Sequence, residues 1–324
     1  MSGSIKHIGI FTSGGDSPGM NAALYGATKA VLANGMRISG IRRGYEGMID
    51  GDFVSMHEKD LQRTVHKGGT ILKTARSERF RKVEGRKIGL KNLKKSEIDA
   101  LIAIGGDGTF HGMLAFSELC SLPFVGIPST IDNDLTGTDY TLGFDTAVNT
   151  AIENIDKIRD TAESHNCVFL IEVMGRDSGY IAIHSGLGTG ADSILIPESS
   201  EDFNWLLEKV RHYHSEEELI VIMSEGDELG ADLVASKIRE VNPSVDLRIS
   251  ILGHIQRGGA PSAFDRILGI RLGVAAVKVL LEGQKNVMAG IANNSLTLTP
   301  FENVVKQHQV NTELQELLTL FYLK

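Results

Sequence analysis

Three short apolar runs, each followed directly by glycines or carboxylates, constrain the fold of this chain more than any other feature. Residues 7–12 (HIGIFT) precede SGGDSPG, residues 99–104 (DALIAI) precede GGDGT, and residues 124–128 (FVGIP) precede STIDND. Apolar runs of this length are typical of buried parallel strands, and ligands bind in the turns that follow the carboxyl ends of such strands. We therefore predict an α/β fold with mostly parallel sheets.

Segments of helical periodicity alternate with the apolar runs. This alternation predicts doubly wound, three-layer αβα domains. The predicted helices cover residues 21–35, 87–95, 110–119, 144–165, 203–214, 230–241 and 264–283. Further strands are expected at residues 37–42 and 168–176 and within residues 193–198, 219–226 and 247–259. Spacing along the last helix predicts one apolar face, made by Ile267, Ile270, Val274, Val277 and Leu281.

Length and composition limit the class of protein. A chain of 324 residues fits about two domains, and we expect a break near residues 141–144 with more than one crossing between domains. The net charge of −8 argues against general nucleic-acid binding. Two cysteines, Cys120 and Cys167, lack metal-ligand or disulfide spacing, and we find no signal peptide and no membrane span. We expect a cytoplasmic protein.

Two glycine-rich turns predict phosphate binding. Glycines in TSGGDSPGMN let the backbone approach a ligand closely, and the following helix offers unpaired N–H groups to an anion. In GGDGT, Asp107 adds one carboxylate that is suited to Mg²⁺, directly or through water. For the first turn alone, a tight structural turn is an equally good interpretation. Two such turns after successive strands favour phosphoryl transfer.

Asp132 and Asp134 follow the third apolar run. One interpretation is turn chemistry, because Asp and Asn hydrogen-bond their own backbone at loop starts. The other is a reaction site at the carboxyl end of a parallel sheet.

Basic residues also follow apolar runs, and Arg in this position suits bidentate contacts to phosphate. They predict a second, non-nucleotide phosphate site: Arg176, Arg248, His254 and Arg257. Arg79, in the segment RSERFR, is interpreted as part of a solvated basic face.

Taken in order, GGDSPGMN, GGDGT, PSTIDNDLTGTDYTLGFDTA, EVMGR and LGHIQRGG resemble the bacterial ATP-dependent 6-phosphofructokinase family. The resemblance extends from about residue 8 to residue 283, and TIDND and GHIQRGG are far more specific to the family than GGDGT. It implies transfer of the γ-phosphoryl group of ATP to the 1-hydroxyl of fructose 6-phosphate, with Mg²⁺, in glycolysis. It also implies a homotetramer.

The resemblance implies two domains with the active site in the cleft between them. Residues 1–143 plus about 256–306 would form the larger, nucleotide-binding domain. Residues 144–255 plus about 307–324 would form the smaller, sugar-phosphate-binding domain.

The resemblance also assigns roles to individual residues. The nucleotide side would comprise Gly15, Arg76, Ser77, Gly106, Asp107, Gly108 and Thr109, with Asp107 on Mg²⁺. The catalytic group would comprise the base Asp132, its supports Thr130 and Asp134, and the phosphoryl-stabilising Arg176. The sugar phosphate would contact Thr130, Ile131, Asp132, Met174, Gly175, Arg176, Glu225, Arg248, His254 and Arg257. Arg248 would reach the site from a neighbouring subunit.

Two departures from the family pattern affect the substrates. Cys167 stands where the family has a second Arg for the 6-phosphate, and one lost charge-assisted contact weakens binding by about 1.5–3 kcal/mol. Ser129 replaces the Gly that precedes TIDND in ATP enzymes, whereas pyrophosphate enzymes have Lys there and an Asp at the position of Gly108. Because Gly108 leaves room for a nucleotide and Ser129 adds no cation, ATP is the favoured donor.

Several alternatives remain at this stage. They are a pyrophosphate-dependent phosphofructokinase, a kinase for another sugar phosphate such as sedoheptulose 7-phosphate, and a catalytically silent regulatory subunit. An NAD kinase would explain GGDGT but not TIDND or GHIQRGG, and a nucleotide-binding oxidoreductase lacks its glycine fingerprint.

Overall fold

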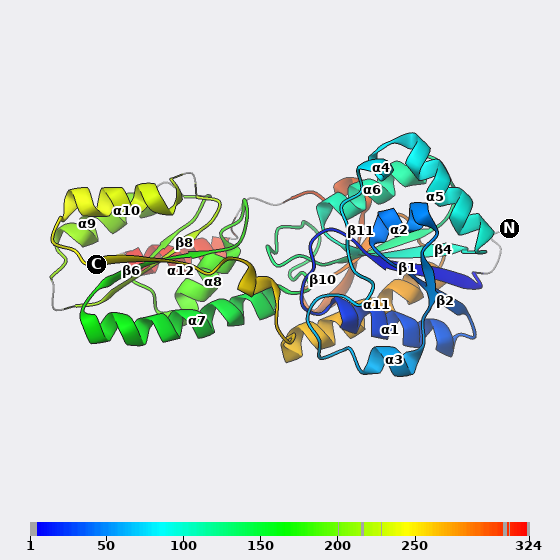
Figure 1. Ribbon diagram of the computed structural model, residues 1–324, viewed down its shortest axis with the longest axis horizontal. Coiled ribbons are helices and arrows are strands. Elements are labelled where there is room, and N and C mark those ends of the chain that lie inside the picture. The colour runs from blue at the N-terminus through cyan, green and yellow to red at the C-terminus, as the bar shows by residue number, and fades with distance from the viewer. Residues whose placement is uncertain are drawn as a thin grey trace. The chain divides into compact units, whose positions relative to one another are not determined.

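The computed structural model describes residues 5–199, 201–214, 217–227, 229–306, 310 and 312–322. The chain forms two compact units, each made of two stretches of sequence (Figure 1). Unit 1 comprises Met1–Thr146 and Arg257–Lys306, and unit 2 comprises Ala147–Gln256 and Gln307–Lys324.

Unit 1 is built on a seven-stranded sheet in the order β11-β10-β5-β4-β1-β2-β3. Its strands are β1 His7–Thr12, β2 Arg37–Ile41, β3 Phe53–Ser55, β4 Ala100–Gly105, β5 Phe124–Pro128, β10 Val287–Ala292 and β11 Ser295–Pro300. The inner strands pair in parallel, and the edge strands β3 and β11 pair antiparallel to their neighbours. From β1 the strand order continues through β2 and β3 to one side, whereas β4 and β5 lie on the other side. The turns after β1 and β4 therefore lie at a topological switch point.

Helices cover both faces of this sheet (Figure 1). The core on one face packs β-strand residues against α1 and α11, including Met20, Leu24, Leu268 and Leu272. The other core uses α2, α4, α5 and α6, with an aromatic group that includes Tyr45, Phe80 and Phe116. The helices of unit 1 are α1 Met20–Ala33, α2 Gly44–Asp50, α3 Glu58–Gln62, α4 Glu78–Arg81, α5 Val83–Lys95, α6 Asp107–Ser117, α11 Ala263–Leu281 and η2 Phe301–Asn303.

Unit 2 has a four-stranded parallel sheet in the order β7-β8-β6-β9. Its strands are β6 Val168–Val173, β7 Ser193–Leu195, β8 Leu219–Ser224 and β9 Leu247–Ile251. One face is covered by α9 and α10, which bury Leu206, Val234 and Ile238 against the strands. The helices are α7 Phe144–His165, which starts in unit 1, α8 Tyr180–Thr189, α9 Asp202–Arg211, α10 Gly230–Val241, η1 Gly253–Arg257 and α12 Thr312–Tyr322.

The predicted α/β fold with two units and mostly parallel sheets is confirmed. The apolar side predicted for α11 is only partly buried, because Val277 is 1% exposed whereas Ile267, Val274 and Leu281 are 60%, 43% and 44% exposed. The helix instead buries Leu268, Leu272 and other residues of its opposite side. Spacing alone failed because α11 is apolar on both sides. Among the described residues, no helix is long and apolar enough to span a membrane.

Candidate active site

The two glycine-rich turns of unit 1 lie against each other. The Ser13 backbone N–H donates to the Ile104 carbonyl at 2.9 Å. A Cβ atom at Gly105 would lie only 2.5 Å from the Ser13 carbonyl oxygen and 2.3 Å from Thr109 Oγ1. Only glycine fits this close approach, which explains the residue type at the end of β4.

The second turn leads directly into α6. Gly106 is the extended residue before the helix, and Asp107 is the first helical residue. The first N–H groups of a helix lack internal partners and attract anions. A Cβ atom at Gly108 would meet nothing within 4 Å, so there is open space beside these N–H groups. The buried Tyr45 hydroxyl fixes the turn by donating to the Thr109 carbonyl at 2.5 Å.

Asp107 is the carboxylate expected to hold a metal ion. Its Oδ1 atom lies 2.9 Å from His111 Nδ1. Across the part of the chain that the structure describes, no three His, Cys, Asp or Glu side chains converge on a metal site. A single carboxylate beside the first N–H groups of a helix suits Mg²⁺, an ion that usually keeps several waters and takes further ligands from substrate phosphates.

The turn after β5 holds two nearly buried carboxylates. Asp132 and Asp134 are 4% and 5% exposed, and the Ile131 side chain between Thr130 and Asp132 is completely buried. Asn133, at φ +50°, organises the turn. Its amide donates to the Asp139 carbonyl and accepts from the Thr141 N–H. The turn chemistry thus falls to Asn133, and the two carboxylates on either side are held almost out of solvent.

Thr130 and Ser129 fix the start of this turn. Thr130 Oγ1 accepts from the Asp132 N–H at 3.2 Å, and the Thr130 carbonyl accepts from Thr141 Oγ1 at 2.5 Å. The hydroxyls of Ser129 and Ser17 are 2.7 Å apart and buried. Ser129 therefore connects the β5 turn to the first glycine-rich turn.

Sequence reasoning missed Asp265, which holds the segment between the β5 turn and α7. This fully buried carboxylate accepts from the N–H groups of Gly143 and Thr146 and from Thr146 Oγ1. Burial raises its pKa, and the hydrogen bonds oppose that rise. No local motif could have identified it, because its partners lie far away in the sequence.

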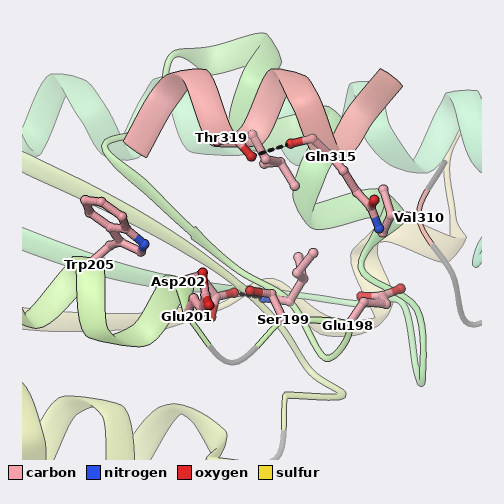
Figure 2. A pocket seen from close by; sticks show the side chains of 10 residues that line it. Glu198, Ser199, Glu201, Asp202, Trp205, Val310, Gln315 and Thr319 are labelled. Carbon is pink, nitrogen blue, oxygen red and sulfur yellow. Dashed lines mark hydrogen bonds between the residues drawn. The ribbon is translucent and has the colours of Figure 1, made fainter. Parts of the chain in front are cut away.

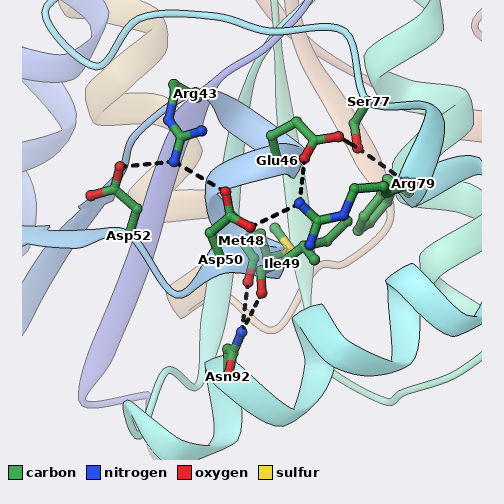
Figure 3. Close-up of polar contacts among 10 residues, drawn as sticks. Arg43, Glu46, Met48, Ile49, Asp50, Asp52, Ser77, Arg79 and Asn92 are labelled. Carbon is green, nitrogen blue, oxygen red and sulfur yellow. Dashed lines mark hydrogen bonds and ion pairs between the residues drawn. The ribbon is translucent and has the colours of Figure 1, made fainter.

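In the segment from Arg76 to Arg81, two side chains contact acidic residues of α2. Arg76 is exposed, whereas Ser77 caps α4 and donates to Glu46 Oε1 at 2.6 Å. Arg79 forms ion pairs with Glu46 and Asp50, as Figure 3 shows. Arg79 is thus an exposed but paired side chain of α4.

In unit 2, four predicted site residues lie at the carboxyl ends of β6 and β8. The Arg176 N–H donates to Glu225 Oε1 at 2.9 Å. Arg176 has φ +54°, and a Cβ atom at Gly175 would lie 2.3 Å from the Ser178 carbonyl oxygen. Met174, nearly buried, donates its N–H to the buried amide of Gln256 at 3.4 Å. The turn after β6 is therefore held in a strained conformation by specific contacts.

The GHIQRGG segment spans the boundary of the units. His254 is exposed on η1 in unit 2, and Arg257 belongs to unit 1. The Arg257 guanidinium lies against the first glycine-rich turn. Its Nη1 atom donates to the Asp16 carbonyl at 3.4 Å, and a Cβ atom at Gly15 would lie 2.6 Å from it.

The expectation that Arg248 follows a strand end is wrong. Arg248 is the second residue of β9 and pairs with Phe169 at the amino end of β6. At about 3.3 Å per residue, this is roughly 16 Å along the strand from Met174. The cause is register, since β9 begins just before Arg248 and its carboxyl end is Ile251. Within unit 2, Arg248 therefore lies at the amino ends of the strands, and Met174 lies at their carboxyl ends.

Cys167 lies at the same end of the strands as Arg248. It is fully buried, and burial raises the pKa of its thiol while the nearby Arg248 charge lowers it. A buried thiol of raised pKa is neither a phosphate ligand nor a reactive nucleophile.

Unit 2 also has a pocket of about 330 Å³ beneath α12, shown in Figure 2. Trp205, the only tryptophan of the chain, lines it, and none of the predicted site residues does. Of its carboxylates, Glu198 accepts from the Gly179 N–H and Asp202 from the Ile196 N–H. These carboxylates serve the local fold.

Comparison with known proteins identifies the family. The phosphofructokinase family model matches residues 7–280. An ATP-dependent 6-phosphofructokinase of Cytophaga hutchinsonii is 48% identical over 97% of both chains, and ATP-dependent 6-phosphofructokinase 1 of Thermus thermophilus is 49% identical over 97% of this chain and 98% of its own. The phosphofructokinase structure from Saccharomyces cerevisiae superposes with a TM-score of 0.85 at 35% identity, covering 92% of this chain and 45% of that longer one. The chain therefore belongs to the phosphofructokinase family.

Proposed function

We propose that Asp132 is the general base with which this chain phosphorylates the 1-hydroxyl of fructose 6-phosphate. The chain is a glycolytic kinase that uses ATP, the donor in the names of its relatives. The observation that carries the role of Asp132 is its position. It is a nearly buried carboxylate at the carboxyl end of β5, beside the strand whose turn begins α6.

Asp132 accepts the proton of the attacking hydroxyl. Thr130 holds the Asp132 backbone, and Asp134 supports the base from the other side of the turn. Arg176 stabilises the charge of the transferring phosphoryl group. Positioning, charge neutralisation and an oriented hydroxyl are what phosphoryl transfer requires of a protein.

The nucleotide half of the site belongs to unit 1. Its residues are Gly15, Arg76, Ser77, Gly106, Asp107, Gly108 and Thr109, with N–H groups at the start of α6 on phosphate oxygens. Asp107 would hold Mg²⁺, and the ion would supply positive charge to neutralise the phosphates. Arg76 reaches the phosphates, and the Ser77 hydroxyl holds α4 in place through Glu46.

Two features support ATP over pyrophosphate as the donor. The space beside Gly108 accommodates a nucleotide. The Ser129 hydroxyl forms a hydrogen bond with the Ser17 hydroxyl. Ser129 carries no positive charge that could help to bind pyrophosphate.

The sugar half belongs largely to unit 2. Met174, Gly175 and Glu225 hold the sugar, with Ile131 contributing through its backbone because its side chain is buried. His254 and Arg257 bind the 6-phosphate. Arg248 binds it from a neighbouring copy in a homotetramer. The position of Arg248, at the opposite end of the strands from Met174, supports this part of the proposal.

A coupled assay with fructose 6-phosphate tests this function. The wild type and Asp132→Ala are each given ATP–Mg²⁺ and pyrophosphate–Mg²⁺ in parallel, with Asp156→Ala, an exposed residue of α7, as the matched control. We expect activity with ATP alone and a loss of about 10³-fold in Asp132→Ala, within the range for a general base. Wild-type preference for pyrophosphate, or full activity of Asp132→Ala, would contradict the proposal.

A further inference from the structure

Asp134 is a nearly buried carboxylate next to another one. Two such groups in one turn repel each other, and each loses hydration, so an ionised pair needs a cation nearby. Lys306 supplies one. Its Nζ atom lies 3.6 Å from Asp134 Oδ2, and its side chain is only 22% exposed.

Lys306 is held by a short segment, Asn303–Lys306, that we call the strap. The Thr136 N–H donates to the Val305 carbonyl at 3.0 Å, and Thr136 Oγ1 donates to the Asn303 carbonyl at 2.9 Å. The Val305 N–H in turn donates to Thr136 Oγ1 at 3.1 Å. Lys306 itself pairs with Leu135 in an antiparallel bridge. The backbone of the β5 turn is thus attached to the strap at several points.

The strap is anchored in the core of unit 1. Val304 is 1% exposed, and Phe301, just before the strap, is 2% exposed. Both belong to the same apolar cluster as Leu135. Apolar anchors on both sides of the contact keep the ammonium group of Lys306 at a fixed place relative to the carboxylates.

We propose that Lys306 is a positioning residue for phosphoryl transfer, which keeps Asp134 ionised and in place beside the base Asp132. This inference rests on the proposed function. Without the cation, the Asp134 carboxylate loses this ion pair, and its support of the base weakens. Binding of ATP and sugar phosphate depends on other residues, so the loss falls on kcat.

The experiment compares Lys306→Met, which keeps an unbranched apolar stem and removes the charge, with Lys306→Arg, which keeps the charge. Lys237→Met is the matched control, because Lys237 forms a surface ion pair, at 2.8 Å from Glu240, on α10 of unit 2 and away from both the β5 turn and the exposed stripe of α11. For each variant, kcat, both KM values and the urea midpoint are measured.

We expect kcat of Lys306→Met to fall by about tenfold or more with both KM values within about threefold, as for loss of an interaction made only in the transition state. Lys306→Arg should recover kcat to within about threefold, and Lys237→Met should match the wild type. A wild-type kcat in Lys306→Met overturns the inference. So does a Lys306→Arg variant that folds, with an unchanged urea midpoint, yet is as slow as Lys306→Met. A wild type without ATP-dependent activity would instead contradict the proposed function.

Discussion

The turn after β5 and the amino ends of the strands in unit 2 differ in how their charged residues are surrounded. In the turn, Asp132 and Asp134 are nearly buried, and hydrogen bonds and the Lys306 ion pair surround them within one unit. At the amino ends, Arg248 pairs with the neighbouring Asp246 and lies far along the strand from Met174. The first region is complete within one chain. In the second, Arg248 contacts Asp246 and Phe169, far from the proposed sugar site of its own unit.

The exposed side of α11 agrees with association of copies. Ile267, Val274 and Leu281 recur every seven residues and are all substantially exposed. A helix that is apolar on all sides is normally covered on all sides. Association of copies would cover this stripe. It could also bring Arg248 of one copy to the proposed sugar-phosphate site of another.

The largest expected effect comes from mixing two defective variants. Asp132→Ala and Arg248→Ala should each be nearly inactive alone. If Arg248 serves the neighbouring copy, an equal mixture after subunit exchange should regain about a quarter of wild-type activity, because one site in four then has both residues.

The matched control for this mixture is Asp132→Ala with Arg176→Ala. Arg176 and Asp132 are assigned to the same chain's site, so this pair should regain nothing. Recovery in the control, or none in the test mixture once copurification of differently tagged chains has shown exchange, would break the comparison.

A second prediction concerns Gly108, in the first turn of α6 after β4, and leaves Arg248 unchanged. Gly108→Asp places a carboxylate where nucleotide phosphates are proposed to lie, so kcat/KM for ATP should fall by about 100-fold through charge repulsion. Gly108→Ala should stay near wild type, because its Cβ atom meets nothing within 4 Å. Steady-state kinetics at varied ATP separates the two variants. An unchanged kcat/KM for ATP in Gly108→Asp would contradict the assignment of Gly108 to the ATP site.

The smallest expected effect concerns a carboxylate of unit 2 that serves the fold. Burial raises the pKa of Asp202 to about 7, against 3.8 in the unfolded chain. Between these values the folded state binds more protons than the unfolded state, so the free energy of unfolding decreases as pH rises. From pH 5 to pH 8 the decrease should be about 3 kcal/mol.

Asp202→Asn should remove this component, because the amide oxygen can still accept from the Ile196 N–H without ionising. Urea unfolding of both proteins at pH 5 and pH 8 measures the difference. Equal pH dependence in the two proteins would show that Asp202 ionises normally in the fold.

Local patterns were sufficient for much of the fold. The bounds predicted for α7 and α10 agree with the structure, and the turns at β1, β4 and β5 were visible as motifs. The antiparallel edge strands β3 and β11 were not predicted, because pairing at a sheet edge depends on the neighbour and not on periodicity. The buried side of α11 was misassigned because both sides are apolar.

The candidate site shows the same division. Asp107 and Asp132 stand in short motifs that predict chemistry by themselves. Lys306 and Asp265 act on segments far from them in the sequence, and nothing near either residue indicates that it faces a particular turn. The position of Arg248 depends on the register between β6 and β9, which tertiary packing sets.

Trp205 has a spectroscopic consequence. As the only indole of the chain, on α9 and 43% exposed at the pocket beneath α12, it makes tryptophan emission a property of unit 2 alone. Emission during denaturation will therefore follow the smaller unit, while circular dichroism follows both. A gap between the two transitions would measure directly how strongly the folding of one unit depends on the other.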